Sequence, residues 1–249
     1  MSQALSTRET RDSAREIKFL IAPNVAARIR DWARSRLAPD PYAIGEAGDD
    51  YRTFSIYFDN GSLDVFNRQG SNGRSKYRIR RYGAADVVFL ERKMRNASML
   101  VKRRTVVAMA DLPKLLEGDV DPGWQGAWFH RRIQARDLQP TAHVSYHRTA
   151  RVGLGTWGPM RLTLDDQVLA CRTQDLGFQP LPSAPVLPDR IVLELKFRVE
   201  MPAVFKHLVE EFALQPQAIS KYRLAVPVIG LDSAARPALE GVVAERRHA

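Results

Sequence analysis

Short segments that alternate between charged and apolar residues are the feature that most restricts how this chain can fold. Successive side chains of a β-strand point to opposite faces, so residues 76–82 place Lys76, Arg78 and Arg80 on one face. The tyrosine and isoleucine between them face the other way. Three further segments pair a carboxylate with a lysine on one strand face, namely Glu16 with Lys18, Glu91 with Lys93, and Glu194 with Lys196.

Two folds accommodate such strands. In one, a half-solvated antiparallel sheet turns its charges to water and its apolar face to the core. In the other, the strands close into a barrel with a charged lumen and an apolar outside covered by helices. Two like charges ~6 Å apart repel by roughly 3 kcal/mol at an effective dielectric constant of 20. The charged lumen therefore requires water, interleaved carboxylates or a bound polyanion.

Strand patterns dominate the middle of the chain, and helical spacing of apolar residues is confined to a few segments. We expect strands at 15–21, 53–58, 76–82, 87–94, 100–109, 143–151, 161–165 and 191–199. We expect helices at 23–37, 111–116 and 202–214. The predicted organisation is a disordered tail at 1–13, one α+β domain at 14–232 and a flexible tail at 233–249, with a long proline-rich loop at 174–189 inside the domain.

The charge balance predicts a polyanionic partner. Among 249 residues, 38 Lys and Arg outnumber 28 Asp and Glu, which gives a net charge of +10. Nucleic acid, an anionic membrane surface and a phosphate-rich substrate all match such a surplus. Nucleic acid is disfavoured because the basic residues alternate with glutamates on the same strands and no nucleic-acid motif is present.

The remaining bulk features concern the compartment. Cys171 is the single cysteine, so an intramolecular disulfide and a cysteine-based zinc site are excluded, and we expect a structural role for it. The N-terminal residues contain no apolar stretch that could serve as a signal peptide. No apolar segment approaches the ~20 residues that span a bilayer. We therefore expect a soluble, cytoplasmic protein without a membrane span.

Seven short motifs in a fixed order resemble the VTC domain, the polyphosphate polymerase domain of the vacuolar transporter chaperone complex. They are SIYFDN at 55–60, YRIRRY at 77–82, LERK at 90–93, YHRTA at 146–150, RLTLD at 161–165, LELK at 193–196 and SKY at 220–222. The resemblance covers roughly residues 14–230 and extends to the wider triphosphate tunnel metalloenzymes, which include the CYTH hydrolases. It implies an eight-stranded antiparallel β-barrel that forms a tunnel, with a few helices packed outside.

The resemblance also implies roles for residues on the charged strand faces. Basic residues grip a triphosphate, and carboxylates hold Mn²⁺ or Mg²⁺. Matched by motif, the basic residues are Lys18, Arg78, Arg80, Lys93, Arg148 and Lys221, with Lys196 beside the metal-binding Glu194. Lys76 joins this face by strand alternation, and Lys102 and Arg104 either extend it or are solvated. Glu16 and Glu91 are further metal ligands or orient Lys18 and Lys93.

Other residues receive simpler interpretations. His143 and His147 are four residues apart on one strand, so their side chains lie ~13 Å apart and we expect ordinary polar roles. Asp165 ends a predicted strand and is either a metal ligand or a turn residue. We expect Asp166 to belong to that turn.

One departure from the wider group favours a particular reaction. CYTH hydrolases begin with Glu-x-Glu-x-Lys, whereas the corresponding positions here are Ala14, Glu16 and Lys18. The missing carboxylate favours a VTC-type polymerase, which transfers the γ-phosphoryl group of ATP to inorganic polyphosphate, over a triphosphatase acting on ATP or triphosphate. A non-catalytic polyphosphate-binding module is the third alternative. The family also implies a separately encoded membrane protein as a partner.

Overall fold

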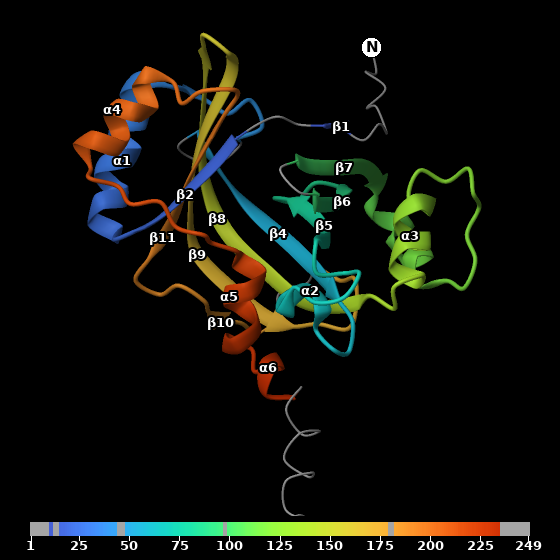
Figure 1. Ribbon diagram of the computed structural model, residues 1–249. Helices are drawn as coiled ribbons and strands as arrows, with labels where there is room; N and C mark the ends of the chain where they lie inside the picture. The colour runs from blue at the N-terminus through green and yellow to red at the C-terminus, as the bar shows by residue number, and fades with distance from the viewer. Residues whose placement is uncertain (1–9, 12–14, 44–47, 97–98, 179–181, 235–249) are drawn as a thin grey trace, which may run out of the picture.

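The computed structural model describes residues 10–11, 15–43, 48–96, 99–178 and 182–234. It has an α+β fold, in which one large antiparallel sheet carries helices on its outer side (Figure 1). The α+β part of the predicted fold class is therefore confirmed. None of the helices in the described ranges is both long and apolar enough to cross a membrane.

The eight predicted strands correspond to the eight longest strands of the sheet. They are β2 (Arg15–Ile21), β4 (Asp50–Asp59), β5 (Ser75–Tyr82), β6 (Val87–Asn96), β7 (Met99–Ala108), β8 (Gln139–Gly155), β9 (Gly158–Arg172) and β11 (Ile191–Phe197). Three two-residue strands add to them, namely β1 (Thr10–Arg11), β3 (Ala38–Pro39) and β10 (Ala184–Pro185). β1 falls within the predicted N-terminal tail, whose other residues up to 13 lie outside the described ranges.

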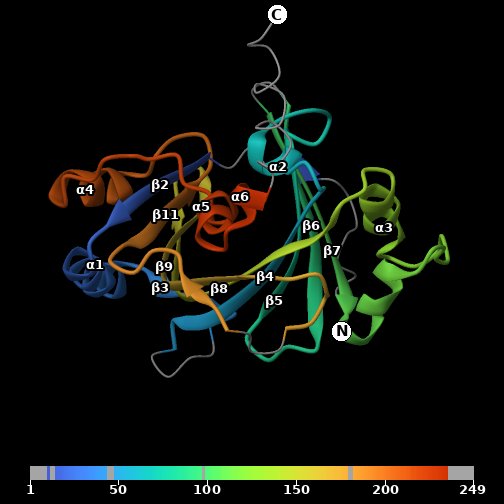
Figure 2. The same cartoon turned by 90° about the horizontal axis from the view of Figure 1, so that it is seen from below.

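The sheet curls so strongly that its two ends approach each other. Its strand order is β1-β7-β6-β5-β4-β8-β9-β11-β2. β1 and β2 thus lie at opposite ends, yet only four Cα–Cα steps separate Arg11 from Arg15, a reach of at most ~14 Å. No backbone ladder joins the two ends among the described residues, so closure into an eight-stranded barrel stays a prediction. Figure 2 shows the curvature around the space between β2 and β5.

The convex face of the sheet is apolar and covered by helices. α1 (Pro23–Arg36) and α4 (Ala203–Glu211) contribute to one hydrophobic cluster, which includes residues such as Leu193 and Leu195 of β11. α3 (Ala127–Gln134) contributes to a second cluster with Ile79 of β5 and Leu90 of β6. The charged strand faces therefore lie on the concave side of the sheet, while closure of the sheet into a barrel stays a prediction.

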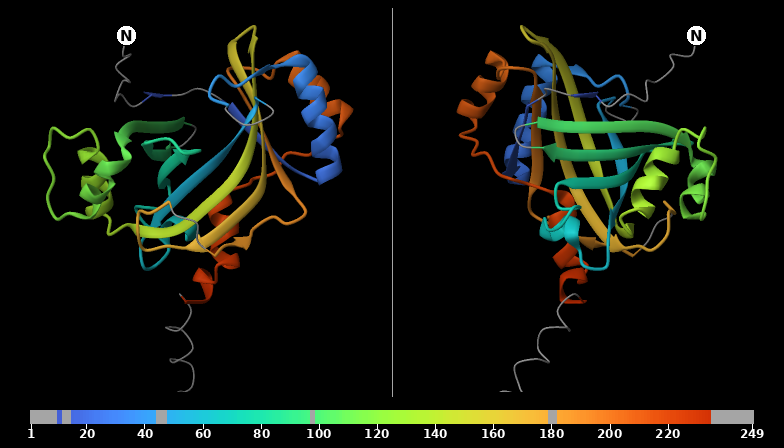
Figure 3. Two further views of the ribbon diagram at one scale, coloured as in Figure 1. Left: turned by 180° about the vertical axis from the view of Figure 1, so that it is seen from behind. Right: turned by 45° about the vertical axis from the view of Figure 1, so that its right-hand side comes forward.

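The helices are predicted less completely than the strands. α1 and α4 lie within predicted segments, and the 3₁₀-helix η1 (Met109–Leu116) covers the predicted segment 111–116. α2 (Asp64–Asn67), α3, α5 (Lys221–Val228) and α6 (Leu231–Ala234) lie outside every predicted helix. Figure 3 shows α3 on the opposite side of the molecule from α1 and α4.

Candidate functional site

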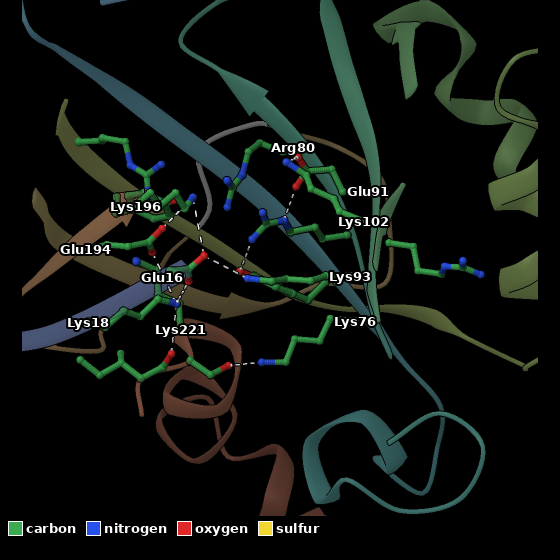
Figure 4. A pocket seen from close by; sticks show the side chains of 17 residues that line it. Glu16, Lys18, Lys76, Arg80, Glu91, Lys93, Lys102, Glu194, Lys196 and Lys221 are labelled. Atoms are coloured by element: carbon green, nitrogen blue, oxygen red, sulfur yellow. Dashed lines mark hydrogen bonds and ion pairs between the residues drawn. The ribbon is translucent and has the colours of Figure 1, made fainter. Parts of the chain in front are cut away.

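A cavity on the concave face is lined by side chains from seven strands and the start of α5, and most of these side chains are charged (Figure 4). Its lining side chains are Glu16, Lys18, Tyr57, Lys76, Arg78, Arg80, Glu91, Lys93, Lys102, Tyr146, Arg148, Glu194, Lys196, Ile219, Ser220 and Lys221. Arg92 also borders the cavity. Arg92 pairs with Arg103 across β6 and β7, so the two side chains lie on the same face of the sheet. The guanidinium of Arg103 lies over the ring of Trp128 in α3, so this face is the convex one.

Of the thirteen predicted site residues, twelve line this cavity. The exception is Arg104, which lies next to the lining residue Glu91, with its Nε 3.1 Å from Oε1 of Glu91. The lining side chains comprise nine lysines and arginines on the concave face but only three glutamates. The cavity thus holds an excess of six positive charges in a partly dehydrated site, where charge interactions are stronger than in water.

Glu16 and Glu194 form one acidic pair inside this positive cavity. Lys18 Nζ lies 2.8 Å from Glu16 and 3.5 Å from Glu194. Lys196 Nζ lies 2.7 Å from Glu194 and 3.8 Å from Glu16, and Lys93 Nζ lies 3.2 Å from Glu16. Burial and Glu194 would both raise the pKa of Glu16, but Lys18, Lys196 and Lys93 lower it to about 2. At Glu194, too, burial would raise the pKa, but Lys196 and Lys18 hold it well below the usual range. Both carboxylates are therefore ionised at neutral pH.

Glu91 belongs to a different cluster from the acidic pair. Arg78 Nε lies 2.6 Å from Oε2 of Glu91, and Lys102 Nζ lies 3.8 Å from Oε1. Together with Arg104, three cations surround this buried carboxylate, and despite burial they hold its pKa well below the usual range. Of the two predicted roles of Glu91, metal ligand or partner of Lys93, the second is not supported by the contacts, because Lys93 lies 3.2 Å from Glu16 and Glu91 contacts Arg78, Lys102 and Arg104.

Asp165 and Asp166 lie in the middle of β9, so of the two roles predicted for Asp165 the turn residue is wrong, and the turn predicted for Asp166 is wrong as well. The strand continues because Asp165 and Asp166 pair with β8 beside a register shift. Arg148 donates two hydrogen bonds to Asp165, 2.6 and 2.7 Å long, and Lys221 Nζ lies 2.5 Å away. Burial would raise the pKa of Asp165, but these cations lower it to about 2. Both its oxygens already bind cations from the chain, so the structure gives Asp165 the task of holding Arg148 and Lys221 in place.

Asp166 and the two histidines lie outside the cavity. Asp166 forms an ion pair with Arg30 of α1, and His147 contacts Asp50 at 2.5 Å. His143 stacks with Phe54 at a ring-centroid distance of 6.1 Å. The expected polar role matches the surroundings of His147, whereas His143 is buried against the rings of Phe54 and Phe178.

Two tyrosines, Tyr57 and Tyr146, also line the cavity, and the alternation of charged residues did not identify them. The Tyr57 hydroxyl accepts a 3.3 Å hydrogen bond from Arg78. Burial would raise the pKa of Tyr57, but Arg78 and Arg80 lower it to about 8. Lys221 Nζ lies 4.6 Å from the centroid of the Tyr146 ring, an attractive cation–π contact. The alternation of 53–58 puts Tyr57 on one strand face, but only the strand register shows that this face is concave.

The start of α5 contributes to one end of the cavity. Ser220 caps the helix, and its hydroxyl lies 2.7 Å from Lys76 Nζ. Lys18 Nζ lies 3.4 Å from the carbonyl oxygen of Ile219. Burial, Lys18 and Lys93 lower the pKa of Lys76 to about 8, although Tyr57 opposes them. Lys76 therefore loses its charge more easily near neutral pH than Lys18, whose pKa is raised by Glu194 and Glu16 despite burial.

The acidic pair provides suitable ligands for a divalent cation. Carboxylate oxygens are the ligands that Mg²⁺ and Mn²⁺ take, and Mg²⁺ commonly binds through one or two carboxylates plus substrate phosphates. Within the described ranges, no group of three or more histidine, cysteine, aspartate or glutamate side chains is placed to hold a metal. Glu16 and Glu194 share Lys18 and Lys196 as partners, so two carboxylates converge there and fit an ion that arrives with phosphate ligands, whereas Glu91 is a single carboxylate among three cations.

A strongly curved antiparallel sheet around a cationic cavity is an arrangement suited to binding an anion. The sequence matches the family model of the VTC domain over residues 13–229. The chain belongs to the VTC domain family, as its seven motifs predict.

Two solved structures are similar to this chain, the first of them closely enough to show the same fold. The crystal structure of a candidate adenylate cyclase from Bacillus halodurans has a TM-score of 0.52 and 15% identity, and the match covers 82% of this chain and 92% of that one. HpAC1 from Hippeastrum, a candidate adenylyl cyclase with a dominant triphosphatase activity, has a TM-score of 0.49 and 15% identity, with 87% and 98% coverage. The comparison with curated proteins found no match.

Proposed function

We propose that this chain is a polyphosphate polymerase that transfers the γ-phosphoryl group of ATP to the end of an inorganic polyphosphate chain inside the cavity. The excess of six positive charges in a VTC domain is the observation that carries the proposal. A phosphate chain supplies the missing negative charge at regular spacing along a linear path. As part of the same proposal, the curled sheet closes around this path as an eight-stranded tunnel.

Phosphoryl transfer needs an in-line arrangement of attacking and leaving oxygens, and neutralisation of the oxygens that gain charge. Arg78 and Arg80 suit this task, because a guanidinium can donate two hydrogen bonds to phosphate oxygens. We assign transition-state neutralisation to these two arginines with Lys93, Arg148 and Lys196. We assign binding of the phosphate chain to Lys18, Lys76, Lys102, Lys221 and, through its position behind Glu91, Arg104.

Several of these cations are fixed before substrate arrives. Asp165 orients Arg148 and Lys221, while Glu91 orients Arg78. Such preorganised charges require little rearrangement during the reaction, which makes them effective at stabilising developing charge. Glu16 and Glu194 would hold Mn²⁺ or Mg²⁺, which supplies charge neutralisation on the phosphate oxygens when bound.

A triphosphatase remains the main alternative, since water could replace the polyphosphate end as the phosphoryl acceptor in the same cavity. A binding module without catalysis would need the same cations only. The presence of Ala14 in place of a carboxylate supports the polymerase. The proposed substrates are thus ATP and inorganic polyphosphate or triphosphate, and nucleic acid is not among them. As part of the proposal, the enzyme acts in the cytoplasm beside a separately encoded membrane protein.

One assay separates the three activities. Purified protein is incubated with ATP and Mn²⁺ or Mg²⁺, and the products are measured as ADP, free phosphate and polyphosphate chains on a gel. Chains formed together with ADP support the polymerase, whereas free phosphate without chains would replace it with the triphosphatase. Retained polyphosphate binding without either product would leave a binding module.

Two variants test the assigned residues. Arg78→Ala should abolish chain formation and weaken triphosphate binding, while Arg190→Ala, at an exposed position before β11, should change neither. Glu194→Gln should lower the activity and raise the Mn²⁺ or Mg²⁺ concentration that it requires, because one of the two metal ligands is lost. Full metal-dependent activity in Glu194→Gln would exclude the acidic pair as the metal site.

A further inference from the structure

The β8–β9 hairpin carries exposed apolar residues at its tip. Figure 1 shows the hairpin, drawn in yellow, projecting beyond the other strands at the end of the sheet away from α5. Leu154 is 80% exposed and Trp157 is 52% exposed, although both are large apolar side chains. The rest of the protein therefore leaves these two side chains largely exposed to water.

The turn residues do not follow from the needs of a tight turn. Gly155 pairs with Gly158, which leaves Thr156 and Trp157 as a two-residue loop. The positive φ in this turn, 109°, lies at Gly158, where a glycine is needed, and neither Thr156 nor Trp157 has a positive φ, so the turn geometry does not select a tryptophan. The tryptophan at this position exposes apolar surface to water, which is unfavourable, and the turn does not require it.

A neighbouring turn extends this surface. The link between β11 and α4 approaches the hairpin closely, because a side chain added at Gly155 would contact Pro202 and one added at Gly158 would contact Arg198. Val199 in this link is 47% exposed. Three exposed apolar side chains from two segments distant in sequence therefore lie at the same end of the molecule.

The surroundings of this apolar tip are basic. The hairpin residues 152–158 contain no charged side chain, and residues 197–206 contain Arg198 and Lys206 but only one acidic residue, Glu200. Arg15 pairs with Phe197 in the adjacent strand. All four of these charged side chains are exposed. Cations around a protruding tryptophan and leucine complement an anionic lipid surface, where tryptophan occupies the interface and basic residues attract the headgroups.

We propose that this end of the molecule docks on an anionic phospholipid membrane, with the side chains of Leu154 and Trp157 inserted between the headgroups. Val199 rests on the same surface, while Arg15, Arg198 and Lys206 contact lipid phosphates and carboxylates. The apolar tip is narrow and projecting, which suits insertion into a deformable layer better than the broad, flat contact of a stable protein interface. In this orientation α5 and its end of the cavity face away from the membrane.

Sedimentation with lipid vesicles tests the proposal. The vesicles contain either phosphatidylcholine alone or two parts phosphatidylcholine to one part phosphatidylserine, and inorganic triphosphate is added to a parallel series to occupy the cavity. We expect binding to the anionic vesicles that is about tenfold stronger than to the neutral ones and that persists with triphosphate. The variant Leu154→Ser/Trp157→Ser should lose about tenfold of this binding.

A matched control removes the same kind of residue elsewhere. Val87→Ser/Leu116→Ser replaces two other exposed apolar side chains and should bind within about twofold of the unmodified protein. Equal losses in both double variants, or no binding to anionic vesicles, would overturn the proposal. Binding that triphosphate abolishes would place the lipid contact at the cavity and also overturn it. Self-association that depends on Leu154 and Trp157, without vesicle binding, would assign the tip to a second copy of the chain instead.

Discussion

The buried Asp165 offers a quantitative test of how the cavity is held together. Its pKa falls from 3.8 to about 2 because Arg148 and Lys221 outweigh the effect of burial. Each pKa unit corresponds to about 1.4 kcal/mol, so the ionised carboxylate stabilises the folded state by about 2–3 kcal/mol relative to the protonated one. Removing one partner of a buried ion pair typically costs about 3–5 kcal/mol. We therefore expect Asp165→Asn to lower the free energy of unfolding by about 2–5 kcal/mol at pH 7.

The pH dependence distinguishes this electrostatic effect from a packing effect. A lowered carboxylate pKa gives stability that is present above the unfolded-state pKa and is lost as the pH falls through the folded-state pKa. The difference between Asp165→Asn and the unmodified protein should accordingly be constant from pH 7 to about pH 5 and shrink toward pH 2. Urea unfolding followed by circular dichroism at several pH values measures it.

An exposed aspartate provides the control for this comparison. Asp189→Asn, in the loop before β11, should change the free energy of unfolding by less than about 0.5 kcal/mol at every pH. A loss below about 1 kcal/mol for Asp165→Asn would refute the assigned role, since such a value matches an ordinary exposed ion pair. A loss of several kcal/mol that does not diminish with acid would show that the cause is packing and not charge.

Three further predictions concern neighbouring groups. Triphosphate binding should be accompanied by proton uptake between about pH 8 and 10, because the negative ligand raises the lowered pKa values of Lys76 and Tyr57. Calorimetry in buffers of different ionisation enthalpy measures this uptake, which should be smaller in Lys76→Met and in Tyr57→Phe. Glu91→Gln should reduce stability by about 3–5 kcal/mol in urea unfolding but tighten triphosphate binding, because three cations lose their internal partner. Tyr222→Phe should cost about 1–3 kcal/mol, because the Tyr222 hydroxyl donates a 2.6 Å hydrogen bond to buried Asp59, and triphosphate affinity should stay within about twofold.

The strands were predictable because their two faces differ chemically. Alternation identifies which residues share a face, and the helices cover the apolar side, so Arg78 and Glu194 reach the same cavity from strands far apart in sequence. Alternation gives no information on cross-strand register. This is why the sequence could not distinguish Glu91, held by three cations, from Glu16, which pairs with Glu194.

The missed helices and the misplaced Asp165 have physical causes too. α3 follows a turn-rich stretch and has no side-chain cap, and α5 contains Pro227, which normally ends a helix. At Asp165 an acidic pair suggested a turn, but Arg148 and Lys221 compensate its charge inside the strand. Partners far apart in sequence determine such a position, and local patterns do not identify them.

The pairing of β2 with β11 has a consequence for how the chain acquires its structure during synthesis. Lys18 lies opposite Glu194, so the first long strand to leave the ribosome pairs with the last one. Contacts between such distant segments form slowly, and until then both strands present unpaired edges. Glu16 and Lys18 join the acidic pair only after β11 emerges. A nascent chain therefore cannot bind a phosphate chain in the complete cavity, and a protein shortened by its first 21 residues would retain most cations but expose β11 as an aggregation-prone edge.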